Sequence, residues 1–180
     1  MSSLYAGFMS TDSLYEVQRT NNFRIVFDNT VDPNGYIELA CDSTGLPNMS
    51  NDPIELAYGN SKIKVAGQAT VDDISVAVKD FIEADIEKIL YDWRKKVYNP
   101  ETGKVGWASN YKKDATIVQY GPNGEVLRKW QLKGVWPTSL DLGEMNYDGG
   151  DKKQITMNLS VDNAILVRDG GTKTNAKGTE

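Results

Sequence analysis

The chain has 180 residues and a formal net charge of −5, and 39% of its residues are hydrophobic, which suits one folded domain with its own core. It contains no histidine, which excludes Ser-His-Asp catalysis and histidine-ligated zinc. The single cysteine, Cys41, excludes an internal disulfide. An acidic chain is also a poor match for a protein that grips a nucleic-acid backbone.

The first residues, Met1 to Tyr5, lack the basic region and the apolar run of a secretory signal. No stretch approaches the ~18 consecutive apolar residues of a membrane-spanning helix. We therefore expect a protein that is made in a reducing cytoplasm and is not inserted into a membrane.

Alternation of apolar and polar residues with a period of two predicts half-buried antiparallel strands. The predicted strands are 23–28, 36–42, 71–79, 115–120, 125–133 and 153–162. Turn-forming sequences at 32–35, 121–124 and 148–151 lie between such runs, and the middle one predicts a hairpin. In the second strand, Cys41 alternates inward with Ile37 and Leu39, which predicts a small buried side chain.

One segment breaks this pattern and predicts a helix near 82–98. Its apolar residues recur at helical spacing, and acidic side chains come early while Arg94, Lys95 and Lys96 come late, as the helix dipole favours. Asp80 is the expected N-terminal cap, with Glu83 as its capping-box partner. This helix is the favoured explanation of the excess of basic residues in 81–133, and like subunits meeting through oppositely charged faces is the alternative.

Three stretches have no regular pattern. We expect an N-terminal arm at 1–20, a long loop at 43–62 and a flexible tail at 167–180, around a β-sandwich domain at 21–166. The arm and the loop contain apolar residues without a core of their own. Such segments either fold back on their own subunit or are covered by a partner, and the sequence leaves both open.

The sequence offers no catalytic residues, cofactor site or metal site. Acidic pairs such as Asp72-Asp73 are expected to be solvated charges, and the acid-rich stretch 141–151 lacks the spacing of an EF-hand loop. No phosphate-binding glycine motif is present. Trp93 and Trp130 fall on apolar faces and are expected in the core, while the roles of Trp107 and Trp136 stay open.

The order of predicted elements, together with five sequence segments, resembles the tail tube proteins of contractile-tailed bacteriophages. The segments are Phe23–Phe27, Tyr91–Gly103, Lys113–Ile117, Trp130–Leu140 and Ile155–Asp162. Related tubes occur in R-type pyocins, extracellular injection systems and type VI secretion systems. The resemblance covers about residues 20–165, and its strongest parts are the helix and the strand that contains Trp136-Pro137.

The resemblance implies a structural virion protein without enzymatic activity or cofactor. Its implied fold is mainly β, with two packed antiparallel sheets (a sandwich or split barrel) and one flanking helix. Six copies form a ring, and rings stack into a hollow tube inside a sheath, through which viral DNA is ejected without specific binding. Further implied partners are baseplate and tail terminator proteins, and the implied location is the virion tail, assembled in the host cytoplasm.

Each copy of such a tube contributes one four-stranded sheet to a shared inner barrel. We expect strands 23–28, 36–42, 71–79 and 153–162 to line this bore, because their exposed sides are acidic or hydroxyl-rich and would not hold phosphates. The expected lumen-facing residues are Asp28, Glu38, Asp42, Asp73, Thr156, Asn158, Ser160 and Asp162. The hairpin 115–133, with exposed lysines, is then expected to face outward.

Ring stacking is assigned to the apolar segments. The expected stacking residues are Leu46, Pro47, Met49, Ile54 and Leu56, together with the arm at Leu4–Tyr15. Two alternatives remain: a tube subunit of a phage-derived injection device, and a monomeric β-sandwich module that binds a sugar or peptide. The second alternative needs a concave aromatic surface, for which Trp107, Tyr111 and Trp136 are the candidates.

Overall fold

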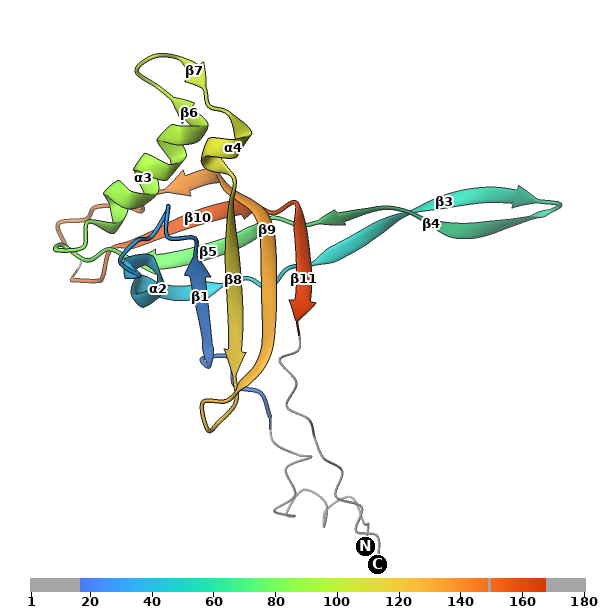
Figure 1. Ribbon diagram of the computed structural model, residues 1–180, viewed down its shortest axis with the longest axis horizontal. Coiled ribbons are helices and arrows are strands. Elements are labelled where there is room, and N and C mark those ends of the chain that lie inside the picture. Colours follow the sequence, from blue (N-terminus) through green and yellow to red (C-terminus); the bar gives the residue numbers. More distant parts are fainter. Residues whose placement is uncertain (1–16, 149, 168–180) are drawn as a thin grey trace, which may run out of the picture.

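The computed structural model describes residues 17–148 and 150–167 (Figure 1), which form a mainly β protein. The strands are β1 (Phe23–Phe27), β2 (Cys41–Thr44), β3 (Met49–Tyr58), β4 (Ser61–Val71), β5 (Ile74–Lys79), β6 (Tyr98–Asn99), β7 (Lys104–Val105), β8 (Lys113–Tyr120), β9 (Val126–Asp141), β10 (Gln154–Ser160) and β11 (Asn163–Val167). The helices are α2 (Tyr36–Ala40), α3 (Ile86–Val97) and α4 (Ala108–Tyr111). The predicted fold class is therefore confirmed as mainly β with few helices.

A seven-stranded antiparallel sheet in the order β1-β8-β9-β10-β5-β2, with β11 also paired to β9, forms the body. The first part of β9 pairs with β8 and β11, and its last part pairs with β10. In Figure 1 these two halves of the sheet run in different directions, vertically for β1, β8 and β11 and horizontally for β10, β5 and β2. The two expected layers are thus halves of one sheet that folds over along β9.

The fold in β9 occurs at Gly134. This residue has a φ of 67°, and the register between β8 and β9 shifts beside it, between Lys113 and Ala115. A Cβ on Gly134 would lie 2.1 Å from the Asp162 carboxylate. Glycine is required here both by the left-handed backbone and by the close approach of the chain that connects β10 to β11.

The core lies between the two halves of the sheet. Its fully buried side chains come from both halves and from α3, and include Ile25, Ile117, Leu132, Ile155, Met157, Leu159 and Leu90. Trp93 of α3 is 2% exposed, its ring meets Phe27 edge-to-face at 5.7 Å, and its Nε1 donates to the Tyr111 carbonyl at 2.9 Å. The prediction that Trp93 belongs to the core is confirmed, whereas Trp130 is only partly buried.

The predicted strand 36–42 is wrong over most of its length. Residues 36–40 form the short helix α2, and β2 begins only at Cys41. The buried carboxylate of Asp32 accepts from the backbone N–H groups of Tyr36 (2.8 Å) and Ile37 (2.8 Å), which satisfies the donors of a first helical turn. Helical spacing then buries Ile37 and leaves Leu39 75% exposed.

Cys41 is half-buried rather than fully buried, because it stands where α2 passes into β2. Desolvation raises the pKa of its thiol to about 11, so the thiolate is scarce at neutral pH.

The predicted helix is confirmed, but it begins later than expected. α3 starts at Ile86, and its cap is Asp85, whose carboxylate accepts from the Lys88 backbone N–H at 3.3 Å. Asp80, the predicted cap, instead forms an ion pair with Lys153 at 3.2 Å. Residues 82–85 therefore form a turn, and Ile82 is 99% exposed instead of lying on the buried stripe.

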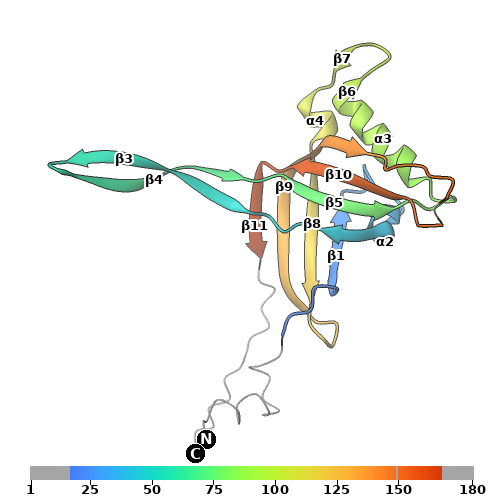
Figure 2. The same ribbon diagram turned by 180° about the vertical axis from the view of Figure 1, so that it is seen from behind.

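The predicted loop 43–62 is also wrong. Residues 49–71 form the hairpin of β3 and β4, which projects far from the body in Figures 1 and 2. We call this hairpin the β3–β4 arm. Nearly all of its residues are exposed on both faces, so it has no buried side of the kind that a half-buried strand shows. The Gly59-Asn60 turn and the alternation of Lys62, Ile63, Lys64 and Val65 were the available signals.

The Gly134 corner generates a stability prediction. Gly134→Ala should be more destabilising than Gly124→Ala by about 1 kcal/mol or more, because both glycines have positive φ but only a Cβ at Gly134 meets another side chain. Denaturant unfolding of the two variants measures the difference. Equal losses would show that the approach of Asp162 imposes no constraint on the corner.

Candidate assembly surfaces

The outward face of the half-sheet formed by β2, β5, β10 and the last part of β9 carries small polar side chains. Thr156 stands opposite Ala77 and Asp141, while Asn158 stands opposite Ser75 and Ser139. The Asn158 amide donates to the Ser139 hydroxyl at 2.9 Å. The other faces of these strands supply core residues such as Ile155 and Val76. We call this surface the polar face.

One acidic side chain of the polar face, Asp42, is paired with lysines, while Asp73 accepts a hydrogen bond from a hydroxyl. Asp42 of β2 forms ion pairs with Lys79, at 3.0 Å, and with Lys152. Hydrogen bonds from Lys152 and then from Lys79 hold the pKa of Asp42 below its ordinary value. Asp73 accepts from the Thr138 hydroxyl at 3.4 Å. The face is therefore polar without a strong field of either sign.

Five of the eight predicted lumen residues come together on this half-sheet. Asp42 lies in β2, Asp73 directly precedes β5, and Thr156, Asn158 and Ser160 share one side of β10.

The other three predicted lumen residues lie elsewhere. Asp28 follows β1, which pairs with β8 in the other half of the sheet, so the expectation that strand 23–28 shares a four-stranded sheet with 71–79 and 153–162 is wrong. Glu38 lies on α2 and forms an ion pair with Arg24. Asp162 lies between β10 and β11 and forms an ion pair with Lys112 at 2.7 Å.

The same half-sheet has two sides on which strand pairing stops. β2 is the last strand in the order and pairs only with β5 among the described strands. From Trp136 onward, β9 pairs only with β10 within residues 17–148 and 150–167. Unpaired strand edges expose backbone donors and acceptors that favour pairing with another chain.

The β3–β4 arm is a second candidate surface. Leu46, Met49, Ile54 and Leu56 are all exposed, as expected of stacking residues, whereas Pro47 is buried at the base of the arm. Sequence reasoning missed three further exposed apolar side chains of the arm, which are Tyr58, Ile63 and Val65. Glu55 binds Lys62 at 2.7 Å and Lys64 at 3.6 Å across the hairpin. The predicted stacking segment Leu4–Tyr15 lies outside the described residues.

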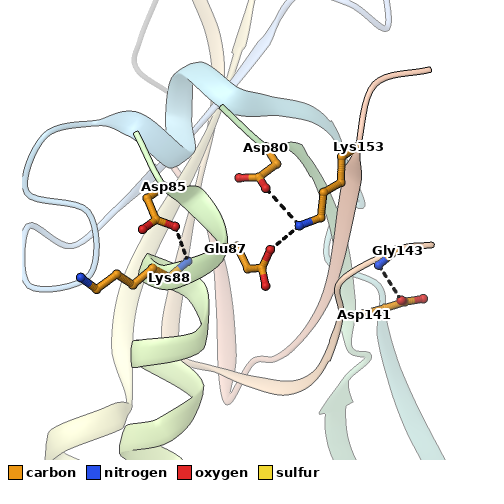
Figure 3. Close-up of polar contacts among 7 residues, drawn as sticks. All are labelled: Asp80, Asp85, Glu87, Lys88, Asp141, Gly143 and Lys153. Atoms are coloured by element: carbon orange, nitrogen blue, oxygen red, sulfur yellow. Dashed lines mark hydrogen bonds and ion pairs between the residues drawn. The ribbon is translucent and has the colours of Figure 1, made fainter. Parts of the chain in front are cut away.

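Figure 3 shows the opposite end of the half-sheet, where the chain leaves β5 and enters α3. Lys153 forms ion pairs with Asp80 and Glu87, and these hydrogen bonds, chiefly the one to Glu87, raise the pKa of the lysine. Asp141 accepts from the Gly143 backbone N–H at 3.0 Å. These contacts hold the segment before β10 against the start of α3.

The proposed aromatic platform does not form. Tyr111 and Trp136 pack edge-to-face on each other at 5.6 Å, while Trp107 is 81% exposed. The described residues also contain no cluster of ligands that could hold a metal ion, and none of their helices is long and apolar enough to cross a membrane. The surfaces with distinctive features are the polar face, the strand edges and the β3–β4 arm.

A folded-over sheet with open strand edges and a projecting apolar hairpin has the features of a structural subunit that is completed by other copies. The chain belongs to the T4-like virus tail tube protein gp19 family, whose model matches residues 19–164. It is 31% identical over 118 residues to the tail tube protein gp19 of Enterobacteria phage T4, a match that covers 63% of this chain and 71% of the relative.

Solved structures that share the fold include a tube-terminating cap and a sheath–tube complex. The tube-terminating cap of the anti-feeding prophage has a TM-score of 0.69 at 18% identity, with 93% of this chain and 99% of that chain covered. A sheath–tube complex of the extracellular contractile injection system PVC has a TM-score of 0.63 at 20% identity, with the same coverage of both chains. The predicted resemblance to contractile tail tube proteins is thus confirmed, and the curated relatives are structural proteins.

Proposed function

We propose that the chain polymerises as stacked hexameric rings into the inner tail tube of a contractile phage, through which viral DNA is ejected into the host. The observation that carries this proposal is the half-sheet of β2, β5, β10 and the end of β9, which combines a polar face with strand edges open on two sides. It has the four strands that the tube architecture requires of each copy. Membership in the tail tube family supports the same assembly.

The dimensions of such a ring suit a DNA duplex. Six copies of a four-stranded half-sheet make a barrel of about 24 strands, which at ~4.8 Å spacing has a perpendicular circumference of ~115 Å. A strand tilt of ~40° widens the circumference to ~150 Å and the backbone diameter to ~48 Å. Inward side chains leave a bore of roughly 40 Å, which is wide enough for a hydrated duplex.

The polar face is the proposed bore lining. Of the sequence-based candidates it retains Asp42, Asp73, Thr156, Asn158 and Ser160, and the structure adds Ser75, Ser139 and Asp141. The lysines of this face, Lys79 and Lys152, are bound by Asp42, and Asp73 and Asp141 add further negative charge, so the face has no excess of positive charge to hold phosphates and DNA slides without counterion release. The other half of the sheet, with the β8–β9 hairpin, then faces outward.

We further propose that the subunit is part of the virion tail, is assembled in the host cytoplasm, and has sheath, baseplate and tail terminator proteins as partners. The likeness to subunits of a sheath–tube complex and a tube-terminating cap supports such partners. The same likeness favours the second candidate function, a tube subunit of a phage-derived injection device whose cargo is not DNA. No enzymatic step is proposed. A monomeric binding module loses its main support, because the aromatic residues it needs do not form one platform.

Electron microscopy of the purified chain tests the assembly directly. Rings or tubes are expected as the concentration rises, because completing the sheet and covering the arm both need further copies. A chain that stays monomeric under all conditions in which the phage tail assembles would contradict the proposal.

Adding positive charge to the polar face should impede DNA passage. Thr156→Lys combined with Asn158→Lys is expected to leave tube assembly intact but to trap DNA in a salt-sensitive way, because lysines in the bore would bind phosphates. Ejection from particles carrying the variant, measured over a range of salt, gives the result. Asn123→Lys, on the exposed β8–β9 turn, is the matched control. Unchanged ejection from the double variant would place the polar face outside the bore.

Charging the arm should stop tube growth. Met49→Asp combined with Ile54→Asp is expected to leave the fold and its melting temperature nearly unchanged, since both side chains are exposed in the subunit, but to abolish stacking. Electron microscopy and circular dichroism together separate the two effects. Val105→Asp, an exposed apolar position outside the arm, is the control and should assemble normally. Normal tubes from the arm variant would exclude the arm from stacking.

A further inference from the structure

The end of the half-sheet opposite the β3–β4 arm carries an exposed apolar patch that the fold does not cover. It consists of Tyr36 and Leu39 of α2 and of Phe81 and Ile82 in the turn before α3. We call these four residues the end patch. Next to it is a hollow of about 670 Å³, lined by Tyr36, Asp80, Phe81, Ile82, Glu83 and Ala84. Ile82, at 99% exposure, buries nothing on its own subunit.

The arm and the end patch are connected by the same strands but lie at opposite ends of them. β5 begins three residues after β4 of the arm ends, at Val71, and it leads directly to Asp80 and Phe81. β2 runs the other way, from α2 toward the arm. Figures 1 and 2 agree that the arm projects away from the end that carries α2 and the start of α3. An arm therefore cannot reach the end patch of its own chain.

The two surfaces are complementary in chemistry. The arm exposes apolar side chains, among them Met49, Ile54 and Leu56, and near its turn Lys62 and Lys64 share one carboxylate, that of Glu55, which leaves a positive charge in excess. The hollow beside the end patch combines apolar walls with Glu83 and with Asp80, which Lys153 binds from one side. Opposite charges at the rim of an apolar contact fix its register and disfavour wrong partners.

We propose that the end patch and its hollow are the acceptor for the β3–β4 arm of a second copy of this chain in the adjoining ring. This inference rests on the proposed function and names the receiving surface for ring stacking. The contact is heterologous, because one end of a subunit binds the other end of its neighbour, so it repeats without closing and grows a polar tube.

The acceptor is held in place before any partner arrives. Lys153 binds Asp80 on one side of the turn and Glu87 on α3, while Asp85 caps the first turn of α3 (Figure 3). Phe81 and Ile82 lie between these fixed points along the chain. A pre-organised acceptor loses little conformational freedom when the arm binds, so more of the apolar burial contributes to stacking.

Cysteine cross-linking between copies tests the contact. One full-length copy carries a cysteine in the arm (Ile54→Cys, Leu56→Cys or Ile63→Cys in turn), and the other carries Ile82→Cys, both with Cys41→Ser. After mixing, tube assembly and oxidation, we expect a disulfide-linked dimer from at least one arm position. Pairing the same arm cysteines with Leu127→Cys, an exposed apolar position in β9, is the control and should give no such dimer.

Tubes that assemble without any arm-to-Ile82 cross-link would overturn the inference while leaving the proposed function intact. A wild-type chain that forms no tubes or rings would overturn the proposed function itself. A cross-link to Ile82 only from the Leu4–Tyr15 segment, placed there by an equivalent cysteine, would assign the end patch to that segment and contradict the inference.

A second variant removes the dependence on cross-linking geometry. Ile82→Asp should leave thermal stability unchanged, because the side chain is exposed, but should raise the concentration needed for tube growth at least tenfold. Lys62→Glu combined with Lys64→Glu should weaken tube growth in the same assay. Adding Glu83→Lys to this double variant, with Asp80 unchanged, should partly restore tube growth. Normal growth of Ile82→Asp tubes, or the absence of any rescue, would count against the end patch as acceptor.

Discussion

Two strand edges, the outer side of β2 and the outer side of the last part of β9, have no strand partner within the described residues. The other assembly features of the molecule depend on these open edges. A sheet that folds over at Gly134 buries its inner faces in one core but does not close on itself. Open edges normally favour uncontrolled pairing with other chains. In the proposed tube the same edges are the sites at which copies join around a ring.

The sequence predicted an acidic or hydroxyl-rich lining, and the polar face contains both kinds of residue. On this face Asp42 is paired with two lysines, whereas Asp73 and Asp141 accept only from a hydroxyl and a backbone N–H. Such exposed pairs contribute little stability, but they cancel fields that would otherwise attract or repel a charged polymer. If this face lines the bore as proposed, its hydroxyls, amides and few charges would let DNA pass at any point along the tube with nearly the same energy. Smooth passage depends on that uniformity more than on repulsion.

The arm and the end patch make the two ends of the subunit different. Both expose apolar side chains that the subunit itself cannot bury, and they lie at opposite ends of β5 and β2. A molecule with complementary surfaces at its two ends adds copies in one orientation. The proposed ring contacts through strand edges and the proposed stacking contacts through the arm use separate surfaces, so a variant can disrupt one without the other.

The sequence by itself determined the mainly β class, the β8–β9 hairpin, β5, β10, the position of α3 and the burial of Trp93, and its resemblance to tail tube proteins identified the family. These features depend on local periodicity, which one chain segment displays without reference to any other. Only the tertiary structure decided that residues 36–40 are helical, because the side chain of Asp32 supplies the hydrogen bonds of that turn. Only it placed β1 outside the half-sheet of β5 and β10, since strand order depends on pairing between distant segments. The arm escaped sequence analysis because a hairpin exposed on both faces has no buried side, and the alternation of Lys62, Ile63, Lys64 and Val65 is short.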